Sequence, residues 1–154
     1  MDLKRLRAGE MVIALAGIVL FASLFLEWYA VGPTKQTAWE AFDLLDIGLV
    51  ITVVSAAATV FFQTTQRGVA IPIGATVITT YLAIIATACV VYRMIDLPGD
   101  GATTQLCLGA WVGLGASLAM MIGGYLSMRQ EESGFLRSRS NATIPILPAP
   151  PVEP

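Results

Sequence analysis

The sequence contains no histidine and only two cysteines, and charged residues make up just 13% of the chain. Histidine is the commonest general base and the commonest metal ligand in proteins. Two cysteines alone form none of the usual zinc patterns. Neither a glycine-rich phosphate loop nor a nucleophile elbow occurs in the sequence. We therefore expect no enzymatic activity, no metal site and no bound cofactor.

Charge is also absent from four long apolar stretches, residues 11–26, 47–62, 68–92 and 101–128. A bilayer core about 30 Å thick requires about 20 apolar residues per helix. In lipid, backbone N–H and C=O groups have to pair within the segment, which favours helices over open strands. The sequence therefore predicts an all-α fold, a transmembrane four-helix bundle over residues 1–128, with helices at about 8–29, 39–64, 69–95 and 103–129.

Positive charge is distributed unevenly over the predicted loops. Cytoplasmic loops of membrane proteins carry an excess of Lys and Arg, which predicts that both termini lie in the cytoplasm (N-in/C-in). The residues on that side are Lys4, Arg5, Arg7, Arg67, Arg129, Arg137 and Arg139, against Lys35 and Arg93 on the other. Residues 129–154 are rich in Ser, Arg and Pro and are predicted to form a disordered cytoplasmic tail. The net charge of −2 gives no support for a nucleic-acid partner.

Aromatic and acidic residues gather near the predicted outer interface. This outer cluster consists of Glu27, Trp28, Tyr29, Trp39, Phe42, Asp43, Asp46 and Arg93. Thr37 and Glu40 form a capping-box pattern at the start of the second predicted helix. In the structural interpretation, which we prefer, Arg93 pairs with a carboxylate and the aromatic rings anchor the helix ends. In the functional interpretation, the rings and carboxylates line a small pocket that binds a cationic group or a partner segment.

Small residues recur at helical spacing in the last apolar stretch. They form two neighbouring stripes, Gly109, Gly113 and Ser117, and Gly115, Ala119 and Gly123. Because membrane helices approach one another at small residues, this helix is predicted to contact two neighbours within the bundle. Alternatively, one stripe pairs with another protein or with a second copy of the chain. The Ser and Thr hydroxyls are expected to bond to helix carbonyls or across helix interfaces.

The two cysteines have similar predicted depths in the membrane. Cys89 lies about one turn inside the outer end of the third predicted helix, and Cys107 lies about one turn inside the outer end of the fourth. A disulfide between them is one hypothesis. The alternative is that each cysteine is simply a small packing residue.

Three sequence patterns carry a resemblance to a known group of proteins. They are Leu-Phe-Leu-x-Trp-Tyr at residues 24–29, Ala-Trp-x-Ala-Phe-x-x-x-Asp at 38–46 and Gly-Ala-Trp at 109–111. In these patterns the chain resembles uncharacterised small four-helix integral membrane proteins encoded in actinobacterial genomes, over residues 10–128. The resemblance implies a multi-pass protein of the bacterial inner (plasma) membrane. It implies no activity and no site residues.

The leading hypothesis for function is a non-enzymatic accessory or scaffolding subunit in the lipid bilayer. Such a subunit binds other membrane-protein helices, or forms a homo-oligomer, through its helix faces. The alternative is a transport or channel component that uses the acidic outer face as a cation entrance. Proton coupling would lack a relay, because no acid occurs within the apolar stretches. A remote alternative is a lipid enzyme whose groups would come from Glu27, Asp43, Asp46, Tyr29 or serines.

Overall fold

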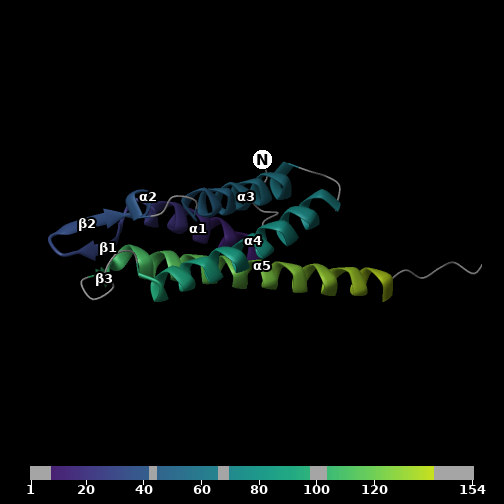
Figure 1. Ribbon diagram of the computed structural model, residues 1–154. Coiled ribbons are helices and arrows are strands. Elements are labelled where there is room, and N and C mark those ends of the chain that lie inside the picture. Colours follow the sequence, from purple (N-terminus) through teal and green to yellow (C-terminus); the bar gives the residue numbers. More distant parts are fainter. Residues whose placement is uncertain (1–7, 42–44, 66–69, 98–103, 141–154) are drawn as a thin grey trace, which may run out of the picture.

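The structure, a computed structural model, describes residues 8–41, 45–65, 70–97 and 104–140, with the backbone alone described for 131–140. The long helices of this part of the chain are α1 (Ala8–Ser23), α3 (Leu45–Thr65), α4 (Ala70–Ile95) and α5 (Leu108–Ser140). The short elements are the helix α2 (Ala38–Ala41) and the strands β1 (Glu27–Val31), β2 (Thr34–Thr37) and β3 (Thr104–Leu106). Figure 1 shows the strands and α2 together at one end of the helices.

Three of the helices are long and apolar enough to cross a membrane. These segments are Leu45–Thr65, Ile71–Ile95 and Leu108–Gln130. The helix α1 has 16 residues, which corresponds to about 24 Å at 1.5 Å per residue and is shorter than a bilayer core of about 30 Å. The prediction of a multi-pass helical membrane protein is confirmed in this form, with three candidate spans and a shorter N-terminal helix.

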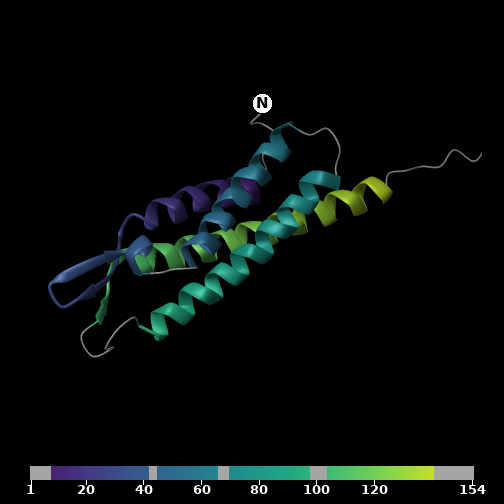
Figure 2. The same cartoon turned by 45° about the horizontal axis from the view of Figure 1, so that its top comes forward.

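The long helices form a ring in which each packs against two others. The interface between α1 and α5 is the most extensive, and the ring is completed by α5 with α4, α4 with α3, and α3 with α1 (Figures 1 and 2). Ile13, Leu20, Leu49, Ala83 and Met120 fill the interior. Large apolar side chains such as Leu15, Ile18, Ile78 and Ile122 are exposed on the outside, as expected for helices surrounded by lipid. The predicted contact of the last helix with two neighbours is confirmed.

The all-α prediction misses a small antiparallel sheet with the strand order β2-β1-β3. Residues 32 and 33 connect β1 to β2, and Gly32 has a φ of 58°, a conformation that L side chains rarely adopt. Glycine at the first central position of a two-residue loop is typical of a type II′ hairpin. The helix predicted over 8–29 is therefore wrong beyond Ser23, because the chain turns there and pairs as β1.

The capping box marks the start of the second predicted helix. The capping box forms as predicted: the N–H of Thr37 donates to Glu40 Oε2 over 2.9 Å. The capping box begins α2, and the next described segment of helix is α3, from Leu45. The residues between them, 42–44, lie outside the described part.

The last helix is displaced toward the C-terminus relative to the prediction. It begins at Leu108, because β3 occupies the positions just before it, and it continues to Ser140. The predicted disordered tail is therefore wrong for residues 129–140, where the backbone continues the helix beyond the apolar segment. Residues 141–154 lie outside the described part. The third predicted helix, 69–95, agrees with α4 within one residue.

Candidate functional site

The side chain of Trp28 is the centre of the junction between the sheet and the helices. It is fully buried, and its ring lies on a gap in α5 made by Gly109 and Gly113. A Cβ atom added at Gly113 would lie 2.6 Å from two carbons of the indole ring, and one added at Gly109 would lie 2.6 Å from the carbonyl oxygen of Glu27. Both positions therefore require glycine. At Gly109 and Gly113 the predicted small-residue stripe lies against the side chain and backbone of β1 and not against a helix.

Two hydrogen bonds fix the orientation of Trp28. Its indole Nε1–H donates to the carbonyl of Ser23 at the end of α1, over 2.7 Å. Its own carbonyl accepts the N–H of Cys107, over 2.9 Å. The same carbonyl also accepts the N–H of Leu26 over 3.1 Å in the turn after α1, so the indole is its second donor. Trp28 thus joins the end of α1, the sheet and the start of α5.

Tyr29 makes the corresponding connection to α4. Its hydroxyl donates to the carbonyl of Arg93 over 3.0 Å, and Nη2 of Arg93 donates to the carbonyl of Ala41 over 3.0 Å. Burial raises the pKa of the Tyr29 phenol, and the positive charge of Arg93 opposes part of this rise. The phenol is therefore neutral at physiological pH and acts as a hydrogen-bond donor.

The other described members of the outer cluster differ in exposure. Glu27 lies on the surface and pairs with Lys35 over 2.7 Å, and this bond raises the pKa of the Lys35 ammonium. Trp39 is 45% exposed and packs its ring against Phe25 with centroids 5.9 Å apart. Asp46 is buried in the first turn of α3. Phe42 and Asp43 lie outside the described residues. The pairing of Arg93 with a carboxylate and the small pocket for a cationic group both stay predictions.

The second small-residue stripe divides between two environments. Gly123 lies against α1, where an added Cβ would be 2.9 Å from the carbonyl oxygen of Gly9. Gly115 lies on the outer face of α5, and an added Cβ there would meet nothing within 4 Å. Ala119 is half-buried. Ser117, from the first stripe, is buried and donates to the carbonyl of Leu114 over 3.0 Å.

The hypothesis of a disulfide is not supported, because both thiols are free in the structure. Cys89 faces α3 from the middle of the α3–α4 interface, whereas Cys107 lies between β3 and α5, next to β1.

Both cysteines are expected to react without reduction. Alkylation of the denatured protein by iodoacetamide should add two adducts per chain, with the same mass in the presence and absence of dithiothreitol. The measurement is the intact mass of the protein. Adducts that appear only after reduction would restore the disulfide.

Hydroxyl groups hold α3 and α4 together near the connection between them. The hydroxyls of Thr59 and Thr79 are 2.8 Å apart, and Thr79 donates to the carbonyl of Ser55 over 3.0 Å. Gln63 also donates to the hydroxyl of Thr76 over 3.4 Å. The predicted role of the hydroxyls, bonding to helix carbonyls and across an interface, is confirmed for these residues.

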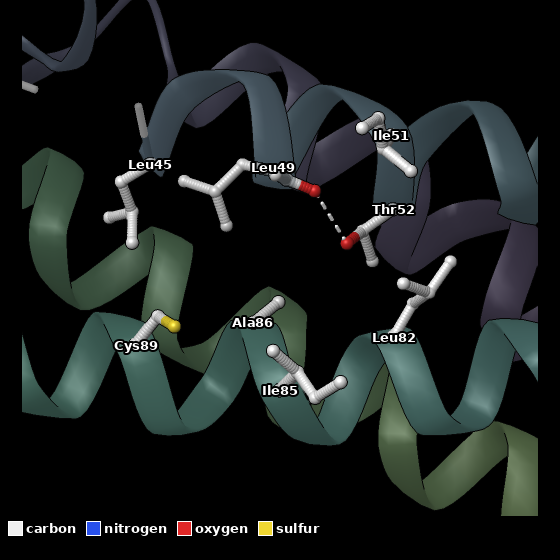
Figure 3. A pocket seen from close by; sticks show the side chains of 9 residues that line it. Leu45, Leu49, Ile51, Thr52, Leu82, Ile85, Ala86 and Cys89 are labelled. Atoms are coloured by element: carbon white, nitrogen blue, oxygen red, sulfur yellow. Dashed lines mark hydrogen bonds between the residues drawn. The ribbon is translucent and has the colours of Figure 1, made fainter. Parts of the chain in front are cut away.

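Toward the sheet, the two helices separate and leave a cavity of about 330 Å³, which we call the α3–α4 groove. Figure 3 shows Leu45, Leu49 and Thr52 pointing from α3 toward Ala86 and Cys89 on α4. The complete lining is Leu45, Gly48, Leu49, Ile51, Thr52, Leu82, Ile85, Ala86 and Cys89. This groove was not predicted from the sequence. The signal for it is weak: Gly48 and Ala86 are small residues on the faces that meet.

Comparisons with known proteins identify no relatives: no protein-family model, no curated protein and no solved structure matches the chain. The fold itself defines the class. Three apolar helices of spanning length, packed with a shorter helix and exposing large apolar side chains, make this a small multi-pass membrane protein. Its topology in the membrane, its partners and its activity stay predictions.

Proposed function

We propose that the protein is a non-enzymatic accessory or scaffolding subunit that binds another membrane helix on the outer face of α5. The observation that carries this proposal is the exposed Gly115. It lies in a stripe of otherwise large exposed side chains, Trp111, Leu118 and Ile122, at steps of four, three and four residues. Hydrophobicity does not draw helices together in lipid, so association depends on close packing at small residues. Gly115 provides such a recess, with Trp111 beside it as a contact residue.

The hydrogen bonds and the ion pair at the sheet end of the protein also support a binding role. Trp28 and Tyr29 donate to backbone carbonyls, and the carboxylate of Glu27 is paired with Lys35. These contacts build the junction and leave the rings covered, which gives less support to a cation entrance. The charge distribution of the sequence supports placing both termini on the cytoplasmic side of a bacterial inner membrane, with the sheet on the outer side.

The replacement Gly115→Leu should abolish partner binding without changing the fold. A photocrosslinking amino acid in place of Leu118 should give one discrete adduct in native membranes, either with another protein or with a second copy. Adding Gly115→Leu fills the recess and should remove this adduct. The measurement is the adduct band after irradiation.

The matched control is Gly74→Leu, which also adds a side chain at an exposed helical glycine with open space around it. It should leave the adduct unchanged. An adduct that persists in Gly115→Leu, or crosslinks to lipid alone in the wild type, would contradict the proposal.

A further inference from the structure

The side chain of Tyr81 places a hydroxyl on the lipid-facing side of α4, where no described group of the chain bonds to it. We propose that this phenol donates to a hydrogen-bond acceptor on a membrane-spanning helix of a different protein, which packs along the outer face of α4. Tyr81 and Gly115 lie on different helices. The α4 face is therefore a second binding surface, in addition to the one on α5.

Tyr81 lies close to the middle of a candidate membrane span. The span is Ile71–Ile95, with residue 83 at its midpoint, and Tyr81 follows Ile71 by ten residues, which is about 15 Å along the helix. A helical side chain is directed toward the N-terminus and covers about one turn. The hydroxyl therefore stays roughly 10 Å inside the level of Ile71. The side chain is too short to reach the membrane interface, where tyrosines of membrane proteins are usually found.

The ring of Tyr81 points away from the rest of the protein. Its side chain is 64% exposed, and Ile78 and Ile85, which lie three and four residues away on the same side of the helix, are 59% and 58% exposed. The opposite sides of α4 pack against α3 and α5. The phenol thus extends into the hydrocarbon, which contains no water and offers no hydrogen-bond acceptor.

Other hydroxyls within the membrane spans are bonded inside the protein. All the threonines of the candidate spans donate to a helix carbonyl. Tyr29 and Tyr92 donate to oxygen atoms of the protein, and the ring of Tyr125 packs against Arg129 near the end of α5. Within the part of the chain that the structure describes, Tyr81 has no such contact. An unbonded hydroxyl in an apolar medium is costly, so a partner that supplies an acceptor at this depth removes that cost.

The depth of the hydroxyl determines the chemistry of the partner. The oxygen atoms of phospholipids lie in the polar headgroup and interfacial regions, outside the hydrocarbon core. At mid-depth, the acceptors come from protein: a Ser, Thr, Asn or Gln side chain on a helix, or a backbone carbonyl that is freed where a proline interrupts a helix. A phospholipid therefore cannot satisfy Tyr81, whereas a membrane helix with one of these groups can.

A second copy of the chain satisfies Tyr81 less well than a different protein does. Two copies that are inserted in the same direction are related by a two-fold axis along the membrane normal, and the same residues then meet at the same depth. Each phenol has one proton to donate. If one Tyr81 donates to the other, the proton of the second remains unbonded. A different protein with an acceptor at this depth leaves no proton unbonded.

The association can be measured in native membranes, with a photocrosslinking amino acid in place of Ile78 in the full-length protein. Irradiation should give one discrete adduct with another protein. The membranes are then fused with increasing amounts of phospholipid vesicles, and the dilution at which half of the adduct is lost measures the strength of the association. Tyr81→Phe keeps the ring and removes the hydroxyl. It should lower this dilution about threefold, the effect of one hydrogen bond of about 0.6 kcal/mol between membrane helices.

Tyr92→Phe is the matched control, because Tyr92 is also exposed on α4 but donates to Asp96 within the chain, over 3.0 Å. It should leave the dilution unchanged. Mass spectrometry of the adduct should place the crosslinked residue within one turn of an acceptor on the partner helix. An adduct with a second copy, adducts with lipid alone, no effect of Tyr81→Phe or an equal effect of Tyr92→Phe would each overturn the proposal. These results are independent of the adduct at Leu118, which reports on α5.

Discussion

Replacing Trp28 with alanine is expected to lower the free energy of unfolding by about 3–5 kcal/mol, the usual cost of removing a fully buried large aromatic side chain. The indole fills the gap above Gly109 and Gly113, and both glycines would face a cavity without it. The carbonyl of Ser23 would also lose one of its two donors and keep the N–H of Leu26. Trp28→Phe keeps part of the ring but not the N–H, and should lose at least the hydrogen bond, about 1 kcal/mol. The measurement is denaturant unfolding in a mild detergent, followed by circular dichroism.

Trp39→Ala is the matched control for this prediction. Trp39 is 45% exposed and contacts Phe25 at the edge of the structure, so its loss should cost less than about 1 kcal/mol. Similar small losses for Trp28→Ala and Trp39→Ala would contradict the central role of Trp28. A loss for Trp28→Phe as large as that for Trp28→Ala would show that the hydrogen bond matters more than the packing.

The helices were predictable where composition alone determines them. α4 agrees with its prediction because a long apolar run ends at charged residues that are followed in the sequence by Pro98 and Gly99. The sheet was not predictable in the same way. Its strands have three to five residues and no alternating pattern, and β1 pairs with β3, which lies far away in the sequence. Only Gly32 with Pro33 gave a local signal, typical of a hairpin.

The residues of the junction were recognised from the sequence, but their connections were not. Trp28 and Tyr29 were predicted to anchor helix ends or to line a small outer pocket, and the glycines of α5 were predicted to be packing residues. Their contact depends on the turn after Ser23, which carries the indole back over α5. Without that turn, Trp28 would lie on a helix and face lipid or another helix. The α3–α4 groove depends on how far two helices separate, and neither helix encodes this distance by itself.

At Gly9 and Gly123, α1 and α5 leave no room for a Cβ atom between their backbones, and replacements there are expected to have the second large effect. A Cβ added at Gly9 would lie 2.7 Å from both the carbonyl oxygen of Gly123 and the N–H nitrogen of Ser127. These are backbone atoms, which cannot rotate away as a side chain can. Gly9→Val and Gly123→Val should therefore each cost about 1–3 kcal/mol or more. The same unfolding measurement in detergent tests both.

The control is the change in stability when alanine replaces a glycine that has open space around it. Gly74 is also in a helix, but an added Cβ there meets nothing within 4 Å. Alanine has a higher helix propensity than glycine by up to about 1 kcal/mol in water, so Gly74→Ala should be neutral or stabilising. Gly9→Ala should instead destabilise the protein, because the steric cost exceeds the gain in propensity. Destabilisation of both variants to the same extent would point to a general effect of glycine replacement and not to the crossing.

Combining the two replacements tests whether the glycines act at one contact. Once Gly9→Ala has pushed α1 away from α5, the side chain of Gly123→Ala enters space that is already wider. The loss in the double variant should therefore be smaller than the sum of the two single losses, by about 0.5 kcal/mol or more. This coupling follows from the shared backbone contact, since Gly9 meets Gly123 and Gly123 meets Gly9. Strict additivity would show that the two helices do not touch at these residues, and the α1–α5 interface would then have to be held by side chains such as Ile13 and Met120 alone.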